Sequence, residues 1–353
     1  MTQISNLTQS RSFSFALIAL LAVVMALLPF FAPRAVVQDL FMILALTVLA
    51  LNWNMLAGFA GLVSVGQQAF VGIGAYTAFA GVILYGLDPL TGVLIAGIVA
   101  MVLSIPVAFF TFRLNGAYFA IATWVVADIL RLAFSQWKAV GGGTGTSLPK
   151  GTTKDMLGVQ AIKDALDVSS AAAADTMLYW LVLALALVTL VASYMFLRSR
   201  MGLGLQAIRD NVNAARSVGV DPLRLKALVF LLTAFGTGIC GALIFLQLGR
   251  ITPNSAFAVT DWTAFVIFIV VIGGIGTLPG PIIGAVVFYI LKRLLSDYGS
   301  VYLIVLGLIG IAIMLFARRG LWGMLKERTG FDLLPLSHRP PAAVQTTKEG
   351  ALT

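Results

Sequence analysis

The chain consists of long apolar stretches separated by short polar segments. A helix needs about 20 apolar residues to cross the hydrocarbon core of a bilayer, and most of these stretches have about that length. The pattern predicts an all-α polytopic transmembrane bundle of about ten helices, with glycine-rich segments that break some of them. The expected spans are 13–31, 36–57, 67–86, 90–112, 117–134, 176–197, 225–248, 258–275, 281–295 and 301–317.

Composition supports a membrane protein and argues against other classes. Of 353 residues, 60% are hydrophobic and 10% are charged, whereas about a quarter of the residues in soluble domains are charged. The formal charge of +9 comes from basic residues that flank apolar spans, which indicates cytoplasmic anchoring and not nucleic-acid binding. With one cysteine, Cys240, one histidine, His338, and no phosphate-binding loop, we expect a non-catalytic chain without a metal site.

The basic residues also predict a topology. If residues 1–12 are cytoplasmic, the transmembrane domain runs over 13–319, and segments 198–226 and 320–353 are cytoplasmic as well. Segment 135–175 then lies outside, with a short amphipathic helix near 159–166, and 320–353 is expected to be a disordered tail. Lys292 and Arg293 fall near the outer side and are exceptions to the rule.

Segment 198–226 has helical spacing in its middle, 205–218. Its apolar face comprises Leu205, Ile208, Val212 and Ala215, and its polar face Arg209, Asn213 and Arg216. Gly219 is expected to end this helix, with Asp221 capping the next one at Pro222. A short cytoplasmic helix between spans indicates docking of a soluble partner. The alternative is a solvated basic loop that only fixes topology.

Two glycine-rich segments interrupt the apolar pattern, 58–74 and 273–280. Irregular backbone at membrane depth survives only where protein or a water-filled cavity satisfies its polar groups. The first segment is therefore either a broken helix lining a pathway or a site of close helix packing through small residues, and whether it is re-entrant stays open. The second is expected to be a tight turn. The glycines assigned to turns are Gly58, Gly61, Gly273, Gly274, Gly276 and Gly280.

Charged residues inside spans are costly, so each calls for an explanation. Asp128 and Arg131 lie three residues apart on one helical face and can pair, and we favour a structural salt bridge over a transport role. Asp261 opens the 258–275 span, where a carboxylate suits the positive end of a helix.

Several motifs together resemble the longer permease subunit of bacterial branched-chain amino acid ABC importers. The resemblance runs from Asn52 to Ala285 and rests on 52–76, 116–123, 141–145, 209–226, 251–253 and 273–285. Within it, Ala214-Ala215, then Gly219, then Val229-Phe230-Leu231 resembles the loop through which ATPase subunits act on the membrane domain. The resemblance implies a bacterial inner-membrane permease without a cofactor of its own. Its partners would be a second permease, two ATPases that bind the ATP, and a periplasmic substrate-binding protein.

The resemblance also implies roles for particular residues. Those expected to couple to the ATPases are Arg209, Asp210, Ala214, Ala215, Arg216 and Gly219. Those expected to line the pathway or contact substrate are Asn52, Asn54, Ser64, Gln67, Tyr76, Tyr118 and Thr123. The expected substrate is a branched-chain or related hydrophobic amino acid. Urea, short amides or aromatic acids are the alternatives within the family, and an ion-coupled secondary transporter is the competing class.

Overall fold

The computed structural model describes residues 11–295, 298–299, 301–316, 319–330 and 334. The first half contains α2 (Arg11–Leu27), η1 (Leu28–Phe30), α3 (Arg34–Asn54), η2 (Met55–Phe59), α4 (Gln67–Tyr85), α5 (Pro89–Thr111), α6 (Ala117–Ser135), η3 (Lys138–Val140), η4 (Gly142–Thr144), β1 (Thr146–Ser147) and α7 (Val159–Leu166). The second half contains α8 (Ser170–Arg198), α9 (Arg200–Asp210), α10 (Val212–Ser217), α11 (Pro222–Leu248), β2 (Arg250–Ile251), α12 (Pro253–Ala256), η5 (Thr260–Ala264), α13 (Phe265–Gly273), α14 (Pro279–Leu295), α15 (Val301–Phe316) and α16 (Gly320–Thr329).

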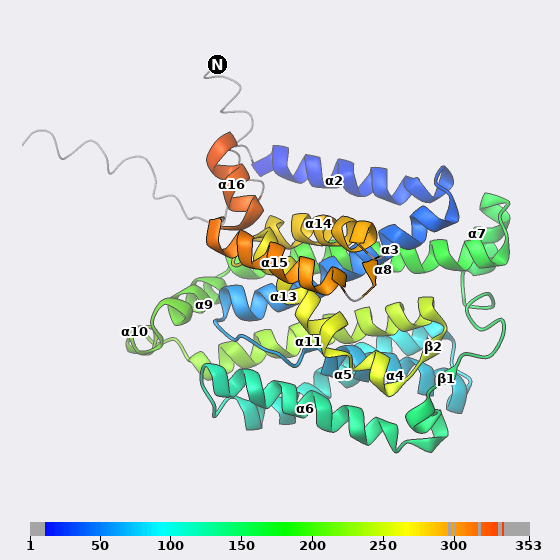
Figure 1. Cartoon of the computed structure of the whole chain (residues 1–353), viewed down its shortest axis with the longest axis horizontal. Coiled ribbons are helices and arrows are strands. Elements are labelled where there is room, and N and C mark those ends of the chain that lie inside the picture. The colour runs from blue at the N-terminus through cyan, green and yellow to red at the C-terminus, as the bar shows by residue number, and fades with distance from the viewer. Residues whose placement is uncertain (1–10, 296–297, 300, 317–318, 331–333, 335–353) are drawn as a thin grey trace, which may run out of the picture.

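The long helices lie side by side in one bundle, which confirms the all-α prediction (Figure 1). Among the described residues, 7 helices are long and apolar enough to cross a membrane, or up to 8 if the bent pair α15 and α16 forms one span. The predicted number of about ten also includes α2 and α14, each 17 residues long and thus at the lower limit for a span.

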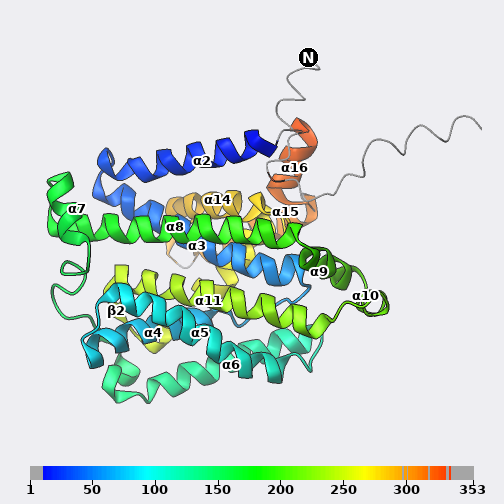
Figure 2. The same ribbon diagram turned by 180° about the vertical axis from the view of Figure 1, so that it is seen from behind.

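The connecting segments gather at two opposite ends of the bundle. In both views α9, α10 and α16 lie at one end, and α7, β1 and β2 lie at the other (Figures 1 and 2). The amphipathic helix expected near 159–166 is α7. At the same end β1 and β2 form a short antiparallel ladder in which Thr146 faces Ile251. Which end faces the cytoplasm stays a prediction.

The core is built around α11, which packs against α3, α4, α5 and α8. Small residues allow this close approach. A Cβ added to Gly74 would lie 2.0 Å from the carbonyl oxygen of Gly238, and one added to Gly241 would lie 2.3 Å from that of Val71. Close packing therefore explains this part of the 58–74 segment. Cys240 on α11 is also fully buried, and its thiol donates to the Ala45 carbonyl on α3 at 3.4 Å.

Two ion pairs and their neighbouring hydrogen bonds join helices that are distant in sequence. Asp175 on α8 accepts hydrogen bonds from Arg34 and Gln38 on α3 and from Gln247 on α11. Asp39 on α3 accepts from Tyr289, at 2.6 Å, and pairs with Arg293, both on α14. Under the predicted topology, this pair with Asp39 accounts for Arg293 as an exception to the charge rule.

Two expected boundaries are wrong. Helix α8 begins at Ser170 and not at 176, because the Ser169 hydroxyl caps it by accepting from the Ala172 amide at 3.3 Å. Helix α16 occupies the start of the tail that was expected to be disordered, because Trp322 is buried where α16 packs against α13 and α14. Residues 331–333 and 335–353 of that tail, and residues 1–10 of the N-terminal segment, lie outside the described part of the chain.

Candidate functional site

The basic segment, residues 198–226, contains two short helices, α9 and α10, between α8 and α11. The single helix expected over 205–218 is wrong, because the backbone at Asn211 is extended, with φ −157 and ψ 110. Its side-chain oxygen accepts from the amides of Asn213 and Ala214 at 3.0 and 3.1 Å, which starts α10 afresh. Asparagine competes well for this capping position. The expected C-terminal signals are present, with Gly219 at φ 84 and Asp221 capping α11.

The expected faces of this segment survive the break. Leu205, Ile208 and Ala215 are buried against the bundle. The expected coupling residues on the other face are exposed: Arg209, Asp210, Ala214, Arg216 and Gly219. Ala215 differs from that group because it anchors α10. The segment is thus held firmly on one side and presents a basic surface on the other.

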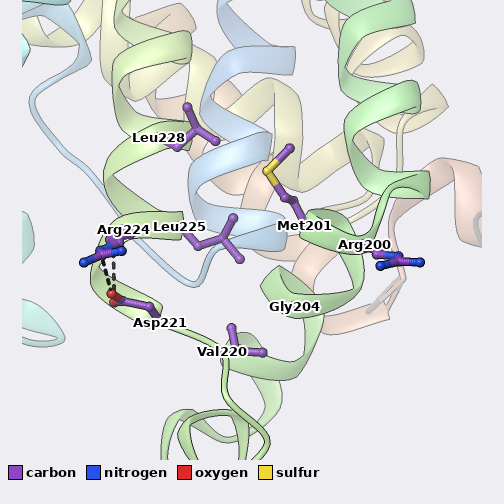
Figure 3. Close-up of a pocket in the computed structure, with 8 residues that line it drawn as sticks. All are labelled: Arg200, Met201, Gly204, Val220, Asp221, Arg224, Leu225 and Leu228. Carbon is purple, nitrogen blue, oxygen red and sulfur yellow. Dashed lines mark hydrogen bonds and ion pairs between the residues drawn. The ribbon is translucent and has the colours of Figure 1, made fainter.

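A groove runs between α9 and the start of α11, with a volume of about 340 Å³. Its floor is apolar and consists of Met201, Gly204, Val220, Leu225 and Leu228. Arg200 and Arg224 stand on opposite sides of it, and the Arg224 Nε lies 3.0 Å from an Asp221 carboxylate oxygen (Figure 3). An apolar floor with arginines at the rim is the composition of a protein interface.

The first glycine-rich segment runs back along the helix that precedes it. After η2, residues 60–66 are irregular, and the carbonyl oxygen of Ser64 accepts from the indole of Trp53 at 2.8 Å. Helix α4 then starts with the Gln67 side-chain amide bonded to the Leu49 carbonyl, also at 2.8 Å. The start of α4 therefore lies beside the interior of α3, and the irregular backbone of 60–66 is re-entrant in the sense that it returns into the bundle.

The two glycine-rich segments contact each other through Asn54. Its side chain accepts from the Gly276 amide and donates to the Thr277 carbonyl, both at 2.8 Å, and it is fully buried. The approach requires glycine, since a Cβ on Gly58 would lie 2.7 Å from the Gly276 nitrogen. Within the second segment, the Thr277 hydroxyl donates to Gly274 at 2.7 Å, which closes the expected tight turn. Asn54 therefore joins two breaks and does not line an open pathway.

Helix α9 reaches the same junction. It contacts η2, and a Cβ added to Gly276 would lie only 3.0 Å from the Arg209 guanidinium. The basic segment is thus in direct contact with the point where α3 and α13 are interrupted.

Three of the expected pathway residues meet in a small polar cavity. Asn52, Ser64 and Gln67 lie around a space of about 10 Å³, which is about the size of one water. The Asn52 amide nitrogen and the Gln67 amide oxygen are buried there and have no hydrogen-bond partner among the described residues. Thr233 and Thr237 on α11 also line this cavity. The sequence does not lead us to predict them as site residues, although their spacing of four residues places them on one helical face.

The other expected pathway residues lie elsewhere. Thr123 on α6 accepts from the Val65 amide at 3.1 Å and so supports the re-entrant stretch. Tyr76 is fully buried in the core, with its ring 4.7 Å from that of Phe134. Tyr118 is 73% exposed on the outside of α6. The structure therefore does not gather these residues into one site.

Comparison with known proteins agrees with this architecture. Residues 35–317 match the family model described as branched-chain amino acid transport system / permease component. The chain is 29% identical to the high-affinity branched-chain amino acid transport system permease protein LivM of Escherichia coli (strain K12), over 88% of this chain and 75% of that protein. It is 34% identical to LivH of the same organism, over 34% of this chain and 38% of that protein. No solved structure matches. The chain belongs to the family of permease components of branched-chain amino acid transport systems.

Proposed function

We propose that this chain is one of two permease subunits of an ATP-driven importer for branched-chain amino acids. In this proposal LivM-like and LivH-like chains form the permease pair, since this chain resembles both. Two ATPase subunits and a periplasmic binding protein complete the assembly, and all ATP chemistry takes place on the ATPases. The N- and C-terminal segments and the end with α9 and α10 lie in the cytoplasm, where the basic residues favour it.

The observation that carries this proposal is the contact between α9 and the interrupted helices. A helix that docks an ATPase must pass a displacement to the transport pathway, and Arg209 beside Gly276 supplies such a connection. When the ATPases close on ATP, α9 moves and shifts the junction of Asn54 with the second glycine-rich segment. The small cavity of Asn52, Ser64 and Gln67 lies next to this junction, and we propose that it widens when the junction shifts.

Charge reversal of the exposed polar face tests the docking. We expect Arg216→Glu to abolish co-purification of the ATPases and ATP-driven uptake, because Arg216 is exposed on α10 and belongs to no ion pair among the described residues. Lys138→Glu is the matched control, since Lys138 is also exposed and belongs to η3, shortly before β1, which lies at the opposite end of the bundle. Normal ATPase association and uptake by Arg216→Glu would refute the coupling role.

A further inference from the structure

Helix α6 has a carboxylate near its middle that no other helix covers. Asp128 lies two residues beyond Val126, the central residue of Ala117–Ser135, and its side chain is 51% exposed. Its oxygen accepts from the Arg131 Nε at 2.7 Å. Arg131 in turn donates from Nη1 to the Asn254 side-chain oxygen on α12 at 3.1 Å. Asp128 and Arg131 on α6 and Asn254 on α12 thus form one hydrogen-bonded polar cluster.

The other carboxylates within the long helices differ from Asp128. Asp39 and Asp175 each receive side chains from at least one other helix, so they hold the bundle together. Within the described residues, Asp128 pairs only with Arg131, three positions along its own helix. An exposed pair of this kind adds little stability. A structural role does not account for a carboxylate at this depth.

Lipid does not account for it either. An ionised side chain near the centre of a bilayer is costly and almost always faces a protein interior or a water-filled cavity. Helix α6 lies along one edge of the bundle, and only 17% of its span is buried within this chain, against 78% for α4 and α11 (Figures 1 and 2). The Asp128 face must therefore meet water or another subunit.

We infer that Asp128, Arg131 and Asn254 bind the charged α-ammonium and α-carboxylate groups of a zwitterionic amino acid in the outer half of the pathway. Asp128 accepts from the ammonium group, and the Arg131 fork donates to the carboxylate. The ion pair has no net charge, and its two separated opposite charges match those of a zwitterion. The neighbouring side chains of Trp124 and Leu132, 49% and 51% exposed, offer apolar contact for an aliphatic side chain. This inference rests on the proposed function and names the substrate class for it.

Cysteine labelling tests whether the site is wet. Cys240 is the only cysteine of this chain and is fully buried, so Cys240→Ala leaves this chain without thiols. In the assembled transporter in proteoliposomes, we expect a charged, membrane-impermeant methanethiosulfonate to modify Asp128→Cys. The matched control is Leu20→Cys, 62% exposed on α2 at the opposite edge of the bundle, and it should stay unmodified. Asp128→Cys that stays unmodified would place the residue against the second permease or lipid and overturn the site.

Transport by neutral variants tests ligand binding. We expect Asp128→Asn and Arg131→Gln each to lower the kcat/KM of ATP-driven leucine uptake by about tenfold or more, with normal assembly, because a charge-assisted hydrogen bond is lost. The control Asp164→Asn, exposed on α7, makes the same charge change outside the spans and should transport normally. If the wild-type complex takes up leucine and both variants have the same kcat/KM as the wild type, the proposed site is refuted but the proposed function is not. A wild-type complex that takes up no amino acid would instead refute the proposed function and the site with it.

Discussion

Replacing Asn54 by alanine is the sharpest test of the junction between the two glycine-rich segments. The change removes the two hydrogen bonds, both 2.8 Å long, that join Asn54 to Gly276 and Thr277. It leaves the Gly276 amide and the Thr277 carbonyl without these partners in a partly buried turn. A buried polar group left unsatisfied costs about 1–3 kcal/mol, and because partial exposure favours the lower half of that range, we expect a total loss of about 2–4 kcal/mol.

The lone cysteine supplies the assay. Cys240 is fully buried in α11, so a thiol-reactive fluorophore in detergent micelles reports opening of the bundle during heating. With an unfolding entropy of about 2.1 cal/mol/K per residue, the expected loss lowers Tm by about 3–5 °C. Asn115→Ala is the control, because Asn115 is exposed in the short loop before α6. An Asn54→Ala protein that melts with the wild type and the control would show that Asn54 does not hold the two segments together.

Three further predictions follow from individual contacts. Gly74→Ala should destabilise the bundle by about 1–3 kcal/mol in the same assay, because its Cβ would lie 2.0 Å from the Gly238 carbonyl oxygen. Gly81→Ala on the same helix, with 3.5 Å to its nearest atom, should not, and equal melting of the two would contradict the packing. Asn211→Ala should cost about 1 kcal/mol of local stability and speed hydrogen exchange of the α10 amides, whereas unchanged exchange would mean that the cap is dispensable. Arg209→Gln should leave Tm unchanged but lower ATP-driven uptake; normal uptake would remove Arg209 from the transmission of motion.

The sequence predicts the features that depend on local residue patterns, such as the buried face of a helix and the ends of helices. Periodicity places Leu205, Ile208 and Ala215 on a buried face, and glycine and proline mark the ends of α10 and α11. The sequence pattern does not predict the extended backbone at Asn211, because the apolar spacing continues across it. Spacing alone does not reveal a side chain that caps a new helix. Local sequence signals therefore predict helices in this segment but not the break between α9 and α10.

The candidate site depends on contacts between residues that are far apart in the sequence. The sequence does not predict these contacts. Asn54 and Gly276 are 222 positions apart, and each looks like an isolated polar or flexible residue until the fold joins them. Tyr76 and Tyr118 look alike in sequence, yet one is in the core and the other is exposed on α6. Burial of an aromatic residue in a membrane helix depends on which neighbouring helix covers it, and apolar faces toward lipid and toward protein have the same composition.

We propose above that this chain transports amino acids with ATP hydrolysed by partner subunits. The most direct test is uptake of radiolabelled leucine into proteoliposomes that contain this chain, the second permease and the ATPases, with ATP inside and binding protein outside. We expect uptake that requires ATP, the binding protein and both permeases. Uptake by this chain alone, driven by an ion gradient, would contradict it and establish a secondary transporter. ATP-driven uptake of urea or an aromatic acid in place of leucine would keep the mechanism and refute the substrate.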